Sequence, residues 1–297
     1  DGAVYGFPTK YENSRWILIN EDMFKEAGLD IPYDGWTYSE FLADAEKLTH
    51  GEGQDKVYVV CWARKHSGNS ILLALDGVLG ANQIYKNEEG TEVNFDNDVY
   101  RAGLNLVKET LDKGYAIPIE DEFSEDISVA NTFLQGKCAI MLGVAQMRLC
   151  MDQENYPHDF MTALVPAPVP DDEKYNTEFY RKQIGTTGAG DLLSISANTK
   201  YPEASFEFAM WYLKGGMSPL VQGGRIPLWN GVNKDEVLSV LKEKAQGSID
   251  MDSMENYLSL DTTQGVAAIK GHASSEISSA WFEEFDAMCY GKQSVDQ

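Results

Sequence analysis

Residues 16–36 read WILINEDMFKEAGLDIPYDGW, and this stretch decides the fold class. The four apolar residues 16–19 form a short run typical of a buried strand. Asn20 can cap a helix directly after it, and two acids follow where a helix N-terminus favours negative charge. Gly28 can end that helix, because glycine readily adopts a left-handed conformation. The stretch therefore predicts a strand followed at once by a helix.

The same alternation continues downstream of this stretch. Thr37 and Glu40 have the spacing of a capping box at the start of a second helix. Two further strands are expected at 57–62 (VYVVCW) and at 138–142 (CAIML), and apolar residues at helical spacing predict a helix over 99–113 between them. Strands that alternate with helices predict an α/β layered sheet rather than a bundle or a sandwich.

The second half of the chain contains the clearest linker, ALVPAPVPDDEK at 163–174, whose three prolines predict an extended crossing between domains. A glycine-rich turn then leads into a strand within GTTGAGDLLSIS, 185–196. Pro202 opens the next helix at its first turn. Further helices are expected over about 235–246 and 275–290.

Length and charge limit the class of protein. At 297 residues the chain is about twice the usual length of one domain, so two lobes are expected. Its 24 Lys and Arg against 47 Asp and Glu give a formal charge of −23, which disfavours binding to nucleic acid or to an anionic membrane surface. It has no apolar run long enough for a membrane span, and its first residues lack the pattern of a signal peptide. The first residue is Asp rather than Met, so the sequence is expected to begin downstream of the start of its gene.

Familiar catalytic and cofactor motifs are missing. The four cysteines form no C-x-x-C pair, and the four histidines never have metal-ligand spacing, so neither a metal nor a cofactor is expected. The glycines of GTTGAG precede a strand instead of a helix, unlike a dinucleotide fingerprint. The cysteines are expected to be buried free thiols. A pair of acids for glycoside hydrolysis stays open, since its diagnostic is a separation in space.

What remains is a set of polar and aromatic residues on loops at strand ends. Flat rings can lie against the apolar faces of sugars while amide, carboxylate and guanidinium groups bind hydroxyls. Trp211 and Trp281 lie within helices and are instead expected to pack there. The candidate ligand contacts are Tyr11, Glu12, Asn13, Trp62, Lys65, His66, Gln146, Asp191, Arg225 and Trp229.

Several segments, in order along the chain, resemble a known family. The stretch 2–49, from GAVYGFPTKYENSRWILIN to FLADAEKLT, is similar to the middle of extracellular solute-binding proteins of bacterial ABC transporters, the family that includes maltose-binding protein. FLQGKCAIMLG (133–143), ISANTKYPEASFEFAMWYL (195–213), GGRIPLWNGV (223–232) and YGKQSVDQ (290–297) resemble its later motifs. The resemblance covers essentially the whole chain.

The resemblance implies an α/β fold of the periplasmic-binding-protein-like class II, seen without its first segment. That segment ordinarily carries the signal peptide, the lipid-anchor cysteine and most of the first lobe. The chain would then hold mostly the C-terminal lobe and a remnant of the N-terminal lobe, whose apolar face should lack its covering. The implied layout is a hinge segment at 1–15, the second lobe at 16–165, a hinge crossing with the first-lobe remnant at 166–235, and helices returning to the second lobe at 236–297.

The resemblance also implies a function. Such a protein binds a carbohydrate in the cleft between two lobes, without catalysis, and delivers it to ABC permease subunits, in the periplasm or at the extracellular face of the bacterial membrane. By position, the loop from Tyr11 to Ser14, the loop from Trp62 to His66 and the turn from Gly188 to Asp191 would face the cleft. Ala145 and Gln146 stand where many members carry an aromatic residue, which puts stacking by that loop in doubt.

Two alternatives remain from the sequence. The acids and aromatics would also suit a carbohydrate-degrading enzyme, and a sensory or adhesion module could reuse the binding fold without transport.

Overall fold

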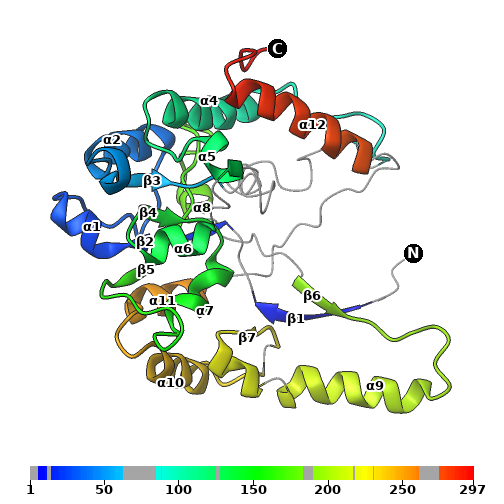
Figure 1. Ribbon diagram of the computed structural model, residues 1–297. Helices are drawn as coiled ribbons and strands as arrows, with labels where there is room; N and C mark the ends of the chain where they lie inside the picture. The colour runs from blue at the N-terminus through cyan, green and yellow to red at the C-terminus, as the bar shows by residue number, and fades with distance from the viewer. Residues whose placement is uncertain are drawn as a thin grey trace.

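The computed structural model describes residues 6–11, 15–62, 85–87, 89–124, 128–182, 190–216, 218–229, 231–260 and 274–297. Within these ranges the strands form two separate sheets, one of four strands in the order β3-β4-β2-β5 and one of three in the order β6-β1-β7. Figure 1 shows the four-stranded sheet inside the larger, helix-rich body and the three-stranded sheet beside it.

The predicted strand after residue 15 lies inside the larger sheet. This strand, β2 (Trp16–Asn20), pairs antiparallel with β4 (Cys138–Met141) and with β5 (Thr162–Pro166). At the far edge, β3 (Tyr58–Val60) pairs parallel with β4. The strand expected at 138–142 is therefore confirmed up to Met141, and the one expected at 57–62 is confirmed for residues 58–60 only.

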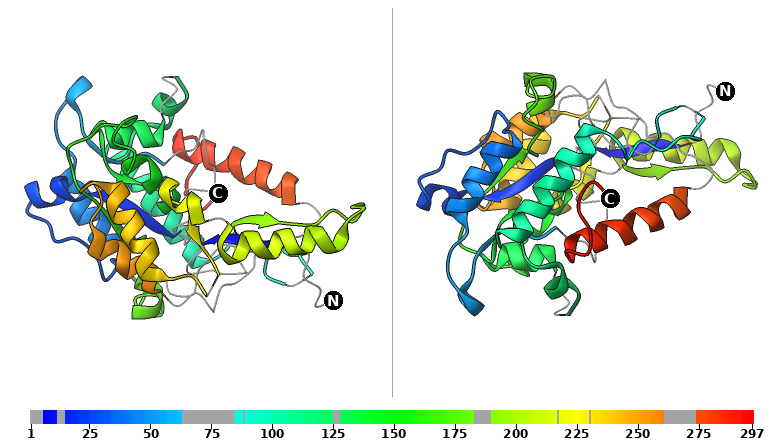
Figure 2. Two further views of the ribbon diagram at one scale, coloured as in Figure 1. Left: turned by 90° about the horizontal axis from the view of Figure 1, so that it is seen from below. Right: turned by 90° about the horizontal axis from the view of Figure 1, so that it is seen from above.

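Helices cover both faces of this sheet, because alternate residues of β2 point to opposite sides. Ile17 and Ile19 pack in one hydrophobic core, and Trp16 and Leu18 pack in another. The helices of the first core are α1 (Glu21–Glu26), α2 (Tyr38–Leu48), α4 (Asp98–Asp112) and α12 (Ser274–Cys289). Those of the second core are α6 (Val129–Leu134), α7 (Met147–Cys150), α10 (Lys234–Ala245) and α11 (Met251–Ser259). The predicted α/β layering is confirmed (Figure 1, Figure 2).

Local signals at the helix ends agree with the sequence. The side chain of Asn20 accepts a hydrogen bond from the Met23 backbone N–H. Thr37 and Glu40 form the predicted capping box. Shorter elements join the main ones: η1 (Gly53–Asp55), α5 (Ile119–Ser124), η3 (Val144–Gln146), α8 (Glu178–Arg181), η4 (Tyr212–Gly216) and η5 (Ser218–Gly223).

The prediction of a linker over 163–174 is wrong for its first residues. Residues 162–166 form β5, which pairs with β2 over five residues and is buried throughout. Pro166 is tolerated because β5 is an edge strand: along its outer edge no neighbouring strand requires a backbone N–H donor. Beyond it, the Val169 N–H donates to the Trp36 carbonyl, so the chain stays next to the start of α2.

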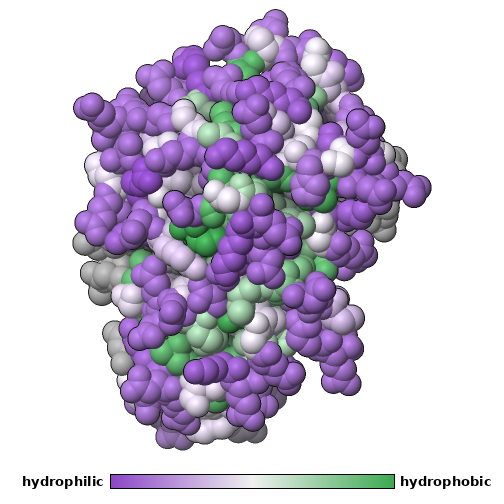
Figure 3. Space-filling view, turned by 90° about the vertical axis from the view of Figure 1, so that its left-hand side faces the viewer, coloured by the Kyte–Doolittle hydropathy of each residue, from purple (hydrophilic) through white to green (hydrophobic). Residues whose placement is uncertain are grey.

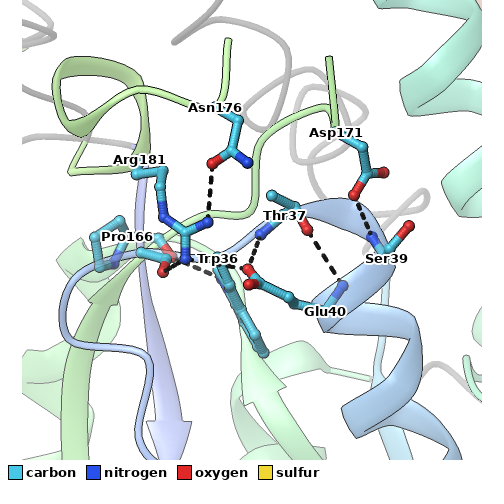
Figure 4. Close-up of polar contacts among 9 residues, drawn as sticks. Trp36, Thr37, Ser39, Glu40, Pro166, Asp171, Asn176 and Arg181 are labelled. Carbon is cyan, nitrogen blue, oxygen red and sulfur yellow. Dashed lines mark hydrogen bonds and ion pairs between the residues drawn. The ribbon is translucent and has the colours of Figure 1, made fainter. Parts of the chain in front are cut away.

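Arg181 holds the end of this segment against the start of α2, as Figure 4 shows. Its guanidinium donates to the Gly35 carbonyl at 2.6 Å, to Glu40 Oε2 at 3.1 Å and to Asn176 Oδ1 at 2.9 Å. The indole N–H of Trp36 donates to the Pro166 carbonyl at 3.0 Å in the same region. Residues 166–182 therefore pack on the body that contains the four-stranded sheet.

Replacing Arg181 by methionine is expected to lower the free energy of unfolding by about 2 kcal/mol, because three hydrogen bonds of a charged guanidinium are lost, one of them to the partly buried Gly35 carbonyl. Urea titration measures this change. Arg101→Met is the matched control, since within the described part of the chain the Arg101 guanidinium pairs with three exposed carboxylates, those of Asp96, Asp98 and Asp296. Its loss should stay under about 1 kcal/mol, and equal losses in the two variants would contradict the assignment.

The smaller sheet is built from three distant segments. Its central strand, β1 (Phe7–Tyr11), pairs antiparallel with β6 (Gly190–Leu193) and with β7 (Ile226–Pro227). The helix α9 (Pro202–Trp211) runs beside it (Figure 1, Figure 2).

This smaller unit exposes much apolar surface. Trp211 is 60% exposed, which corrects the expectation that it packs within the helix layer; Trp281, by contrast, stacks on Phe285 as expected. Other large exposed side chains of this unit are Leu192, Tyr201, Phe206 and Phe208. They agree with the expected uncovered apolar face.

The side of the molecule away from this smaller unit exposes less apolar surface. Figure 3 shows the side that carries α1 and α2, where the surface is mostly hydrophilic and hydrophobic residues appear only in narrow strips. Among the described residues, no helix is both long and apolar enough to cross a membrane.

Candidate functional site

The chain passes between the two sheets three times. It leaves the smaller sheet after β1 to enter β2, returns between β5 and β6, and leaves again after β7 for α10, which packs in the second core. Among the described residues, four candidate contacts lie at or next to the strand ends that these passages connect: Tyr11, Asp191, Arg225 and Trp229.

The register of the smaller sheet brings three candidate segments together. Tyr11, the last residue of β1, pairs with Ile226, the neighbour of Arg225. On the other side of β1, Lys10 pairs with Gly190, the neighbour of Asp191. Trp229 follows β7 by two residues and is 43% exposed, so its ring is available for stacking.

Gln146 enters this region from the larger sheet. It lies in η3, directly after β4, and is half-buried. Its neighbours Val144 and Ala145 line a cavity of about 60 Å³ at the junction of the two bodies. The cavity is lined by Lys10, Val144, Ala145, Met147, Arg148, Gly224, Arg225, Ile226 and Tyr257. The structure thus brings Arg225 and the loop of Gln146 to one place.

Trp62 does not lie on this surface. Its side chain is only 3% exposed, and its indole N–H donates to Thr110 Oγ1 at 2.9 Å. The ring is part of the core that α2 and α4 cover. Trp62 follows the end of β3 by two residues. Because both a core residue and a ligand-stacking residue can occupy the end of a strand, the sequence alone did not decide between these two roles.

Other predicted contacts lie outside the described residues: Glu12, Asn13, Ser14, Lys65, His66 and Gly188. Tyr11 and Asp191 are described by their backbone position only.

Among the residues that line the cavity, sequence reasoning missed three with polar side-chain groups, Lys10, Arg148 and Tyr257. Lys10 had a usable signal, because residues two apart in a strand share a face and Glu12 was already a candidate. Arg148 and Tyr257 carried none, since only the packing of α7 and α11 brings them there.

The buried thiols of this chain are expected to be unreactive. Cys61, Cys138 and Cys150 are buried, and burial raises the pKa of Cys138 and of Cys150 to about 12. A thiol with such a pKa is protonated near neutrality and is a poor nucleophile. Cys289 is half-buried, so the expectation of buried free thiols is confirmed for the other three. In the described part of the chain, no group of three or more His, Cys, Asp or Glu could hold a metal ion.

Comparison with known proteins gives a family match and many structural matches. The model of the family described as bacterial extracellular solute-binding protein matches residues 1–214. No curated protein matches the chain.

Solved structures share its fold at low sequence identity. An ABC substrate-binding protein from Listeria monocytogenes, in complex with cycloalternan, has 19% identity and a TM-score of 0.68, covering 99% of this chain and 69% of its own. The sugar-binding protein MalE from Xanthomonas citri has 18% identity and a TM-score of 0.68, with coverages of 100% and 68%. A solute-binding protein of an ABC transporter from Agrobacterium vitis S4, with bound D-mannitol, has 17% identity and a TM-score of 0.62, with coverages of 100% and 70%.

Proposed function

Because the chain belongs to the bacterial extracellular solute-binding protein family and has its class II periplasmic-binding-protein-like fold, we propose that it binds a carbohydrate between two lobes and delivers it to an ABC importer. The family match over residues 1–214 is the observation that carries this proposal. The sugars and the polyol named for similar structures support the choice of ligand class. The permease subunits of the importer would be its protein partner, outside the cell or in the periplasm.

The proposed lobes follow the two sheets. Residues 1–15 would form a hinge segment, 16–165 together with 236–297 the second lobe, and 166–235 the hinge crossing and the first-lobe remnant. The pairing of β1 with β6 and β7 attaches residues 7–11 of the hinge segment to the first-lobe remnant. The packing of α10 in the second core supports the return of the chain to the second lobe. Within 166–235, residues 166–182 pack against the second lobe through the contacts of Arg181, which supports a first-lobe remnant that begins only after Lys182.

The ligand would lie along the passages between the lobes. Trp229 fits a stacking platform by its exposure, whereas the burial of Trp62 favours a supporting role beneath the site. The other proposed contacts are Tyr11, Glu12, Asn13, Ser14, Lys65, His66, Gln146, Gly188, Asp191 and Arg225.

Such a protein works by closure rather than by covalent chemistry. A ligand that touches both lobes binds the closed state more tightly than the open one, and this difference in affinity drives closure. The permease then distinguishes the loaded, closed form from the open one. No step requires bond cleavage, so the proposal assigns no enzymatic activity.

Isothermal titration of the full-length protein with mono- and oligosaccharides tests this function. We expect saturable binding, no release of reducing sugar, and at least a tenfold loss of affinity in Trp229→Ala, because stacking area on the sugar disappears. Tyr201→Ala is the control, since Tyr201 is also an exposed aromatic residue but precedes α9, away from the passages. Release of reducing sugar would indicate the carbohydrate-degrading alternative, and equal effects of the two substitutions would remove Trp229 from the site.

A further inference from the structure

Trp229 lies on a turn at the third passage between the two bodies. This passage runs from β7, which ends at Pro227, to α10, which begins at Lys234. The backbone N–H of Val232 donates to the Trp229 carbonyl at 3.0 Å and closes a turn that contains Gly231. Because β7 belongs to the smaller sheet and Val232 packs against the second core, both ends of the turn are fixed.

The ring of Trp229 lies face-on against Gly231. A Cβ atom placed on Gly231 would lie 2.3 Å from Cζ2, 2.4 Å from Cη2 and 2.7 Å from Cε2 of the Trp229 ring. These three atoms are consecutive in the six-membered ring, with Cζ2 in the middle. An approach along the ring edge would leave the outer two atoms much farther away than the middle one. The similar distances therefore place Gly231 against a flat side of the ring.

The ring, and not the backbone, is the reason for glycine at position 231. The φ angle of Gly231 lies outside the left-handed region, so its backbone conformation does not itself require glycine. An alanine methyl group, however, would overlap the ring, since all three distances are below 3.0 Å. The ring is the partner that can move, because Trp229 is 43% exposed and its side chain rotates about two torsions. A substitution at 231 is thus expected to displace the ring and to leave the fold intact.

This contact determines how a ligand can stack on Trp229. One flat side of the ring is covered by Gly231, so the exposed surface of Trp229 comes from the other side and from the ring edges. A sugar ring would therefore stack on a single side. Because the indole is already held by the turn, binding would cost little loss of side-chain freedom.

We infer that Gly231 is a positioning residue, which holds the Trp229 ring so that one flat side of it is presented to a carbohydrate at the passage. The inference rests on the proposed carbohydrate function and deepens it. Gly231 acts through Trp229 and need not touch the ligand itself.

Acrylamide quenching of tryptophan fluorescence tests the ring contact without a ligand. In a background of Trp211→Phe and Trp281→Phe, quenching reports mainly on Trp229, because the other tryptophans are at most 3% exposed: Trp16, Trp36 and Trp62. Acrylamide is uncharged, so the formal charge of −23 does not repel it. Gly231→Ala should raise the quenching constant by a factor of about 1.5 or more, because the methyl group lifts the ring from the backbone. An unchanged constant would overturn the inference.

Isothermal titration of the full-length protein with cycloalternan, maltotriose and D-mannitol tests the effect on binding. For each of these that the parent binds, Gly231→Ala should weaken binding about fivefold or more, with an unchanged urea midpoint of unfolding. If circular dichroism shows that alanine alters the fold, Gly231→Ser decides, since its Cβ atom meets the ring in the same way.

Gly216→Ala is the matched control for both measurements. A Cβ atom placed on Gly216 would lie 2.6, 2.7 and 2.8 Å from three consecutive atoms of the Trp211 ring, again over a flat side. Trp211 is the last residue of α9 and lies outside the three passages along the chain. Gly216→Ala should therefore change affinity less than about twofold and leave the quenching of Trp229 unchanged.

The outcomes separate this inference from the function on which it rests. If the parent binds a carbohydrate and Gly231→Ala binds it equally well, Gly231 has no positioning role and the carbohydrate function stands. Equal losses of affinity in Gly231→Ala and Gly216→Ala would also overturn the inference, because displacement of any exposed ring would then have the same effect. If none of the three probes binds, both the function and the inference fail.

Discussion

Replacement of Gly35 by alanine is expected to lower the free energy of unfolding by about 3 kcal/mol or more, since two penalties combine. Gly35 has φ +79°, where a side chain is strained. In addition, a Cβ atom at this position would lie 2.6 Å from the Arg181 carbonyl carbon and still closer to the carbonyl oxygen. These are backbone atoms, so the contact cannot be relieved by a change of rotamer.

The displacement would reach beyond the turn itself. The Arg181 side chain donates to the Gly35 carbonyl, and the carbonyl of Lys182 accepts the Trp16 indole N–H at 3.2 Å. Moving the end of α8 away from Gly35 therefore disturbs the hydrogen bonds of Arg181 at the start of α2. It also disturbs a hydrogen bond of Trp16, which is fully buried.

Gly28→Ala is a matched control for this substitution. Gly28 has φ +68°, but nothing lies within 4 Å of a Cβ atom placed there. It carries only the conformational penalty, about 1 kcal/mol. Urea unfolding of the two variants at neutral pH gives the difference, and losses of equal size would mean that backbone conformation alone, and not the approach of Arg181, sets the penalty.

The parts of the fold that sequence predicted are those specified locally. Asn20, Gly28 and the Thr37–Glu40 capping box act within a few residues of themselves, so their pattern could be recognised without knowledge of the neighbours. The apolar run of β2 likewise needs only to be buried on both faces, whichever helices cover it.

The features that sequence missed depend on distant partners. Prolines in residues 163–170 are compatible with a linker and with an edge strand, and only pairing with β2 decides between them. Trp211 shares the helical spacing of a packing residue, yet it is 60% exposed, because helical spacing alone does not specify which face a neighbour covers. The small cavity at the junction of the two bodies is a third case, because its lining residues Lys10 and Arg148 are 138 positions apart and converge only in the folded chain.

A steep loss of stability is also expected in alkaline solution, because two thiols are buried where charge is disfavoured. Burial raises the pKa of Cys138 and of Cys150 from 9.0 to about 12. Each thiol therefore contributes its full stabilisation below pH 9, and that contribution falls as pH rises from 9 towards 12, since the unfolded chain ionises first. Burial also raises the pKa of Tyr38, which adds to the loss above pH 10.

The size of this effect follows from the shift. Each buried thiol should lose about 2 kcal/mol of stabilisation between pH 9 and pH 10.5, at about 1.4 kcal/mol per pH unit. The double variant Cys138→Ala/Cys150→Ala should therefore lose about 4 kcal/mol less than the parent over this interval. Urea unfolding in reducing buffer at a series of pH values measures both slopes. A double variant that keeps the slope of the parent would show that other groups cause the alkaline loss.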